Sequence, residues 1–197
     1  MSVVPSSSVA SMVNLSRIYT RTGDEGLTRL AGGEQVPKTD VRVAACGAVD
    51  EANCAIGVAL GSALDDDVAA MLRAVQNDLF DLGADLVTPY PDGPATGSRR
   101  IDSLYVDRLE AWCDRYGDDM PSLTSFVLPG GSQPAAQLHV ARAVVRRAEL
   151  AVWGAADVGF NPWIVRYLNR LSDLLFILAR HCARQTGAEE LLWVPGR

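Results

Sequence analysis

Residues 19–38 bring together the kinds of side chain that bind phosphate groups in proteins. These twenty residues include three threonines, four glycines, two arginines, a lysine and an aspartate. Glycine lets backbone N–H groups approach an anion closely, and hydroxyl and cationic side chains complete such a site. The segment contains no G-x-x-x-x-G-K-[ST] motif and is therefore not a P-loop. A polar, glycine-rich segment is more often an ordinary loop, so phosphate binding is a hypothesis at this point.

Polar side chains also recur at helical spacing in two later segments. Residues three or four positions apart share one face of a helix, and only Arg147 points about 100° away from its neighbour Arg146. The set comprises Arg142, Arg146, Arg147 and Glu149 in the first segment, and Asn169, Arg170 and Asp173 in the second. The ordinary alternative is a row of solvated salt bridges, each worth a few tenths of a kcal/mol. However, both rows border apolar seams, so we expect them to lie near packed surfaces.

Five amphipathic segments would position these side chains. Strands are nearly absent from the pattern, and successive helices joined by short loops predict an all-α helix bundle. Residues 88–98 form an expected loop, and residues 125–131 a short β-prone piece before the fourth helix. The expected helices run from about Asp40 to Leu60, from Asp66 past Leu86, from Asp102 to Gly117, from Ser132 to Trp153 and from Asn161 to Gln185.

Composition restricts the classes of protein that this chain can belong to. The formal net charge of −6 argues against a general nucleic-acid binder. No apolar run approaches the roughly 20 residues that cross a bilayer, and residues 1–16 lack the features of a signal peptide. We therefore expect a cytoplasmic protein with a disordered N-terminal tail over residues 1–16 and one domain over residues 17–190.

Cysteine and histidine usage gives little support for metal chemistry. The chain has four cysteines and no C-x-x-C pair, which favours buried free thiols in a reducing compartment. Only two histidines occur and no Glu-x-x-His is present, which excludes a ferritin-like di-iron site and makes catalytic zinc a poor candidate. His139 is expected to be a helix-packing residue. No residue is therefore assigned as a metal ligand.

Three blocks together resemble the PduO-type ATP:cob(I)alamin adenosyltransferases. They are residues 19–26 with Lys38, residues 126–149 and residues 167–176, and the similarity extends from about Arg17 to Cys182. The resemblance implies a five-helix bundle of the ferritin-like, adenosyltransferase type with a short ordered phosphate-binding segment. It also implies a homotrimer with active sites between subunits. The implied reaction transfers the 5′-deoxyadenosyl group of ATP to the cobalt of cob(I)alamin, which gives adenosylcobalamin and triphosphate.

The resemblance also implies roles for particular residues. ATP would be held by Thr20, Arg21, Thr22, Gly23, Thr28, Arg29 and Lys38 of one subunit. From the neighbouring subunit, Arg146, Arg147, Ala148, Glu149, Leu150 and Asn169 would complete the nucleotide site. On the corrin side, Asp50 and Arg142 would pair across the boundary and Phe126 would lie against the lower face. The catalytic set would be Arg142, Arg146, Asn169 and Asp173, with Arg170 supporting it.

This sequence departs from the family pattern at three positions. Arg21 stands where lysine is common, which preserves the charge. Arg29 replaces a small hydroxyl residue, so its contact with ATP is an open question. Leu150 occupies a position where a further arginine is common, which shortens the basic run by one residue.

The expected chemistry requires no protein nucleophile. Cob(I)alamin is itself a strong nucleophile, and Arg146, Lys38 and Mg²⁺ would stabilise the leaving triphosphate. A reductase would supply the reduced corrinoid, and a partner mutase would use the adenosylated product. Two alternatives remain open: a corrinoid-carrying module that has lost catalysis, and a structural bundle with ordinary salt-bridged faces. Formation of adenosylcobalamin from ATP and reduced cobalamin would distinguish the enzyme from the first alternative. Saturable ATP binding would distinguish it from the second.

Overall fold

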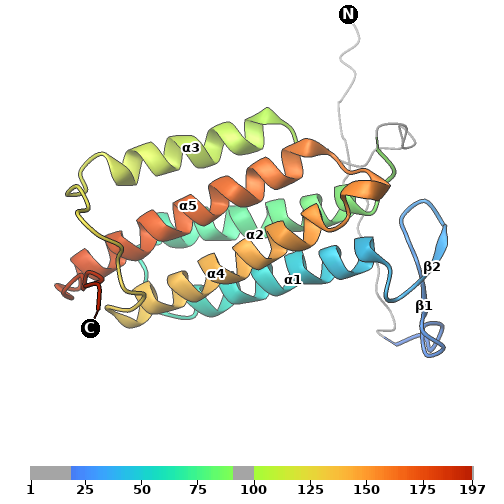
Figure 1. The fold of residues 1–197 in the computed structure, drawn as a ribbon, viewed down its shortest axis with the longest axis horizontal. Coiled ribbons are helices and arrows are strands. Elements are labelled where there is room, and N and C mark those ends of the chain that lie inside the picture. Colours follow the sequence, from blue (N-terminus) through green and yellow to red (C-terminus); the bar gives the residue numbers. More distant parts are fainter. Residues whose placement is uncertain (1–18, 91–99, 197) are drawn as a thin grey trace, which may run out of the picture.

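The computed structural model describes residues 19–90 and 100–196 of the chain (Figure 1). The expected tail over residues 1–16 and most of the expected loop over residues 88–98 lie outside these ranges. A short hairpin precedes the helices and consists of β1 (Leu27–Arg29) and β2 (Gln35–Pro37). The helices are α1 (Val41–Leu60), α2 (Asp66–Leu86), α3 (Ser103–Gly117), α4 (Gln133–Trp153) and α5 (Pro162–Gln185), with a 3₁₀ turn at Ala156–Val158. The predicted all-α five-helix bundle is confirmed.

The helices begin where capping chemistry predicts. Asp40 accepts a hydrogen bond from the backbone N–H of Arg42, and Asp102 accepts one from Leu104. Ser132 and Asn161 cap α4 and α5 in the same way, and each of these helices has proline in its first turn. A side-chain oxygen at this position satisfies one N–H that the helix itself leaves unpaired, and proline has no N–H to leave unpaired. These starts match the predicted ones within about one residue.

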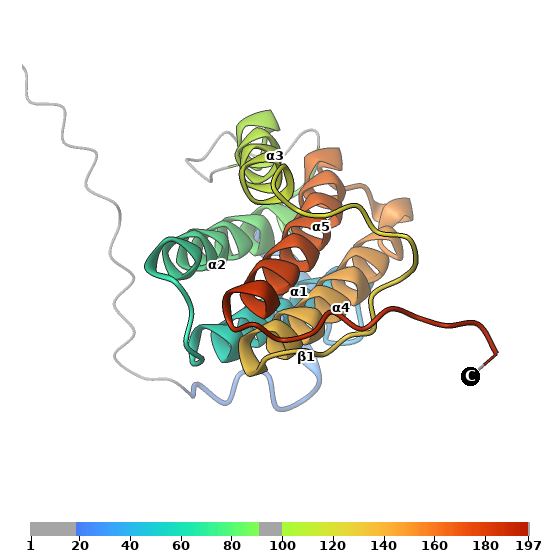
Figure 2. The ribbon, with the colours of Figure 1, turned by 90° about the vertical axis from the view of Figure 1, so that its left-hand side faces the viewer.

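Helix α5 lies at the centre of the bundle, with the other four helices arranged around it (Figure 2). Its leucine seam is fully buried, including Leu168, Leu171 and Leu175. Truncating one such leucine to alanine costs about 2–5 kcal/mol, so this seam holds the other helices in place. Where α1 packs on α4, small side chains such as Ala52 and Ala148 are completely buried, which lets the two helices approach closely.

Two buried carboxylates connect α2 to the rest of the bundle. Asp85 accepts hydrogen bonds from the backbone N–H of Ile101 at 2.9 Å and from the Asn161 side chain at 2.8 Å. Asp78 accepts one from the Tyr167 hydroxyl at 2.8 Å. Burial raises the pKa of Tyr167 well above its ordinary value, so this phenol stays protonated as a donor. The apolar periodicity of α2 gave no sign of either carboxylate.

Some local expectations are corrected by the structure. Only Cys182 is buried, whereas Cys46 and Cys113 are partly exposed and Cys54 is exposed on the outer side of α1. The spacing of apolar residues did not identify which side of α1 faces the bundle. Residues 125–131 form no strand but one isolated bridge, Val127 to Leu192. His139 is buried, as expected for a packing residue, and its ring centroid lies 6.0 Å from that of Phe176.

Helix α1 is long and apolar enough to cross a membrane if length and composition alone are considered. It was not expected to pass this test. It packs along α2 and α4, and the core helices of globular bundles pass the same test. The result is therefore weak support for a membrane span.

Candidate functional site

The hairpin half of the site brings the predicted phosphate-binding residues into one small region. The hydroxyls of Thr20 and Thr22 lie 2.8 Å apart. A side chain at Gly23 would approach the Lys38 Nζ to 3.0 Å, so this cation lies directly beside the glycine turn. Thr22, Gly23 and Thr28 line a surface hollow of about 630 Å³. The arrangement of hydroxyls, a cation and an open glycine turn is well suited to oxyanions.

A salt-bridge cluster fixes this hairpin to the start of α1. Arg42 binds Glu34 in the hairpin turn at 2.9 Å and the capping Asp40 at 3.0 Å. The hydrogen bonds from Arg42 hold the pKa of Asp40 below its usual range, and the two carboxylates raise the pKa of Arg42. Arg42 therefore joins the helix cap and the hairpin turn through one guanidinium group. The resemblance did not identify Arg42 or Glu34.

We expect Arg42→Ala to loosen the hairpin without unfolding the bundle. Partly exposed ion pairs contribute little to global stability, but this one sets the position of the phosphate-binding turn. The KM for ATP should rise roughly tenfold while the melting temperature changes by only a few degrees. Kinetics and thermal unfolding of the same preparation test this. An unchanged KM for ATP would show that the hairpin is held without Arg42.

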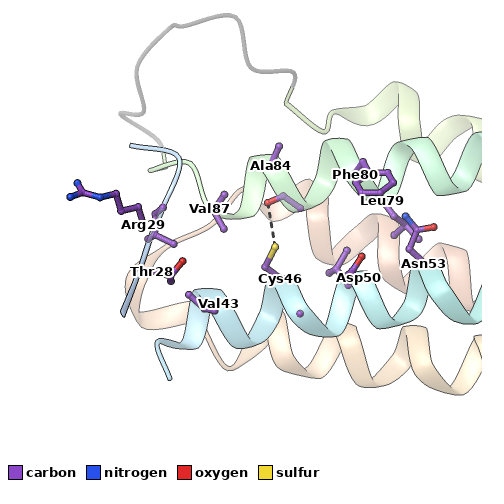
Figure 3. Close-up of a pocket in the computed structure, with 14 residues that line it drawn as sticks. Thr28, Arg29, Val43, Cys46, Asp50, Asn53, Leu79, Phe80, Ala84 and Val87 are labelled. Atoms are coloured by element: carbon purple, nitrogen blue, oxygen red, sulfur yellow. Dashed lines mark hydrogen bonds between the residues drawn. The ribbon is translucent and has the colours of Figure 1, made fainter. Parts of the chain in front are cut away.

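A cleft of about 550 Å³ opens between α1 and α2 beside the hairpin (Figure 3). Asp50 and Cys46 of α1 face Phe80 and Val87 of α2 across it. Phe80 is exposed, so part of this largely apolar wall is uncovered. Arg29 points away from the cleft and donates a hydrogen bond to the Gly33 carbonyl at 3.4 Å. The structure therefore gives Arg29 a partner in its own hairpin turn, and its contact with ATP stays a prediction.

The helix half of the site lies on α4 and α5. The Asn169 side chain donates to Glu149 at 3.2 Å, so the polar faces of α4 and α5 meet at this point. Both residues line a hollow of about 490 Å³ together with residues of α3. Arg147 instead pairs with Glu51 of α1 at 2.5 Å. The hairpin residues and these helix residues thus line different hollows of the single chain.

Two arginines of α4 have unused hydrogen-bonding capacity. Arg146 is exposed and makes no hydrogen bond or ion pair with the residues that the structure describes. The Nε of Arg142 is buried and likewise has no partner among residues 19–90 and 100–196. A buried N–H without a partner costs about 1–3 kcal/mol, so such groups in native proteins usually bind ordered water or a ligand.

The remaining predicted residues have mixed surroundings. Arg170 binds Glu110 of α3 at 3.0 Å and Asp173 at 2.6 Å, which is the salt-bridged arrangement of the ordinary alternative. The Ala148 side chain is completely buried in the core and cannot reach a ligand on the surface of α4. Leu150 is exposed. The substrate contact of Asp173 is a prediction that these contacts leave untested.

Phe126 is part of the segment before α4, and the start of that helix lies at the opposite end of the bundle from the hairpin (Figure 1). Its side chain is 77% exposed. It packs against Trp193 near the C-terminus, with ring centroids 6.1 Å apart. Sequence reasoning did not predict this contact, because the two residues are far apart in the chain and no periodicity relates them.

The fold is that of a helical bundle with two polar surfaces, one of which has the residue types that bind oxyanions. A family model described as cobalamin adenosyltransferase matches residues 18–182. A corrinoid adenosyltransferase of Mycobacterium tuberculosis is 53% identical over 93% of this chain and 96% of its own length. A human corrinoid adenosyltransferase is 36% identical over 91% of this chain and 74% of its own length.

Solved structures agree with these sequence comparisons. A PduO-type ATP:corrinoid adenosyltransferase from Lactobacillus reuteri, a phenylalanine-to-histidine variant complexed with cobalamin and ATP, has a TM-score of 0.84. It is 34% identical, and the match covers 92% of this chain and 98% of that one. The chain therefore belongs to the cobalamin adenosyltransferase family. The predicted activity, ATP-dependent transfer of an adenosyl group to a corrinoid, is confirmed.

Proposed function

We propose that the nucleotide is bound between two copies of this chain in a homotrimer. The hairpin of one subunit, with Thr22, Gly23 and Lys38, would surround the phosphates. Arg146 and Asn169 of the next subunit would complete the site. Arg146 carries this proposal, because its exposed guanidinium makes no hydrogen bond or ion pair with the described residues and can bind an anionic ligand.

Asp50 is the acceptor that we assign to Arg142 across the subunit boundary. It is exposed at the edge of the α1–α2 cleft, where a side chain from another subunit can enter. A charged hydrogen bond of this kind both joins subunits and fixes the orientation of α4 against α1. Phe126 would lie against the lower face of the corrin, where it keeps an axial ligand away from cobalt.

The reaction then needs positioning and charge stabilisation from the protein. The electron pair of cobalt(I) attacks C5′ of ATP, the Co–C bond forms, and the C5′–O bond breaks. The electron pair of that bond leaves with triphosphate, whose growing negative charge Arg146 and Lys38 would stabilise. In each subunit, a single catalytic domain over residues 17–190 would provide the groups of both halves, and each site would combine halves from two subunits.

Magnesium would enter this site with ATP. The described residues contain no group of three or more His, Cys, Asp or Glu side chains that could hold a metal ion. Mg²⁺ commonly binds phosphate oxygens and water together with only one or two carboxylates. The anion-binding hairpin fits a metal–nucleotide complex, in which the phosphates are the main ligands. A cytoplasmic location, a reductase and a recipient mutase complete the proposal.

Turnover of ATP with chemically reduced cobalamin tests this function. Adenosylcobalamin and triphosphate should form in equal amounts, and chelation of Mg²⁺ should lower the rate at least tenfold, since the metal neutralises the leaving group. The visible spectrum follows the corrinoid, and chromatography follows triphosphate. Saturable binding of both substrates without product would support the corrinoid-carrying alternative instead.

A further inference from the structure

The C-terminal end of α2 forms a surface against which the hairpin packs. Leu30 of the hairpin is buried and lines the α1–α2 cleft together with Val87, which lies beside the hairpin in Figure 3. A Cβ atom at Gly32, in the hairpin turn, would lie 3.9 Å from the ring of Pro89, which is an ordinary packing distance. The position of the hairpin therefore depends on residues 87–89, in addition to the ion pairs that join it to α1.

Arg100 holds this end of α2 through its carbonyl groups. Its guanidinium donates hydrogen bonds to the carbonyl oxygen of Pro89 at 2.7 Å and to those of Thr88 and Asp85 at 3.3 Å each. The last carbonyls of a helix have no partner within the helix, so a side-chain donor here supplies bonds that the helix cannot make. One side chain thus fixes the final turn of α2 and the residues that follow it.

A buried carboxylate holds Arg100 in this position. The Asp85 side chain is completely buried and forms an ion pair with Arg100. It also accepts hydrogen bonds from the backbone N–H of Ile101 and from the side chain of Asn161, which caps α5. Asn161 in turn donates to the Ile101 carbonyl at 2.7 Å. Because charge-assisted hydrogen bonds in a buried network allow few other geometries, the guanidinium is fixed between α2 and the start of α5.

We infer that Arg100 is a positioning residue for the nucleotide, because it fixes the end of α2 against which the phosphate-binding hairpin packs. This inference rests on the role proposed for the hairpin. Arg100 does not line the hairpin hollow, and its hydrogen bonds among the described residues all go to α2 and the residues after it. It therefore acts through Pro89 and the hairpin turn. Small displacements of a binding group weaken its action strongly, so a rigid support for the hairpin contributes to ATP binding.

The test compares Arg100→Ala with Arg108→Ala. Arg108 makes the same kind of pair, with the nearly buried Asp78 of α2 at 2.5 Å, but it has no hydrogen bond to the end of α2 among the described residues. For Arg100→Ala, the KM for ATP should rise roughly tenfold, and amide hydrogen exchange over residues 27–37 should become faster. Arg108→Ala should lower the melting temperature in the same way but leave both properties unchanged. Arg100→Ala should still fold, because Asp85 keeps its two other donors.

Arg100→Lys separates the support of the hairpin from the stability of the bundle. Lysine keeps a positive charge beside Asp85, so most of the melting temperature that Arg100→Ala loses should return. A compact ammonium group cannot reproduce the fork of donors that reaches Asp85 and the Pro89 carbonyl together. The KM for ATP should therefore stay raised, by at least roughly threefold, and the hairpin should still exchange faster than in the unchanged protein. Full recovery of both properties with lysine would assign Arg100 a role in stability alone.

Three further results would overturn the inference. In the first, Arg100→Ala leaves the KM for ATP unchanged while Lys38→Ala raises it, so that the hairpin binds ATP without support from Arg100. In the second, Lys38→Ala also leaves the KM for ATP unchanged, which would remove the role proposed for the hairpin as well. In the third, Arg108→Ala raises the KM for ATP as much as Arg100→Ala does, which would assign both effects to a general loss of stability.

Discussion

Replacing Arg146 with alanine should lower kcat about a hundredfold to a thousandfold, which is the usual effect of removing one donor that stabilises a leaving group. Arg146 is exposed and makes no bond within the described chain, so its loss should leave the bundle intact. Its guanidinium would meet triphosphate only when a neighbouring subunit presents the hairpin. The charge on the leaving group grows as the C5′–O bond breaks, so the effect should fall mainly on kcat.

The matched control for this variant is Arg115→Ala on α3. Arg115 pairs with Asp67 at 2.6 Å on an exposed surface, and such pairs contribute little. The control should retain normal turnover and a normal melting temperature. Arg146→Lys should recover only part of the rate, because lysine cannot reproduce two parallel hydrogen bonds. If Arg146→Ala turned over at the rate of the unchanged protein, Arg146 would have no part in the chemistry.

Breaking the proposed pair between Asp50 and Arg142 should give the second large effect. Asp50→Ala would leave the partly exposed Arg142 guanidinium without its proposed partner, which costs about 1–3 kcal/mol. We expect at least a tenfold loss in kcat/KM for cobalamin and weaker assembly of the trimer. Steady-state kinetics and analytical ultracentrifugation measure the two consequences separately.

The exchanged double variant, Asp50→Arg with Arg142→Asp, distinguishes a direct pair from two independent sites. If the residues meet across the boundary, the double variant should be more active than either single charge reversal, because opposite charges face each other again. If the losses of the two single variants simply add, the residues do not interact.

The sequence was most informative about features that depend on neighbouring residues. Capping by Asp40, Ser132 and Asn161 placed the helix starts, because each cap acts on N–H groups two or three residues away. The 3.6-residue period placed the α5 leucines in the core. The same period did not predict that Cys54 is exposed, because α1 is apolar around most of its circumference and periodicity then cannot identify the buried side.

Contacts between distant segments were beyond such reasoning. Backbone hydrogen bonds bring Trp193 to Phe126, and such pairing has no side-chain signature in a stretch this short. Arg170 is ion-paired with Asp173, whereas Arg146 has no partner among the described residues. Spacing alone did not predict this difference. Spacing identifies a shared helix face, and only the neighbouring helices decide which of its members are paired.

A mixing experiment tests the two-subunit site most directly. Lys38→Ala should inactivate the hairpin half and Arg146→Ala the helix half, so each purified homotrimer should be nearly inactive. When equal amounts are dissociated and reassembled together, each site takes its two halves from different chains. About a quarter of the sites in a cyclic trimer should then have both halves intact, and activity should return to about that fraction of the unchanged protein. Activity that stays at the level of the separate variants would show that both residues act within one chain and would contradict the account.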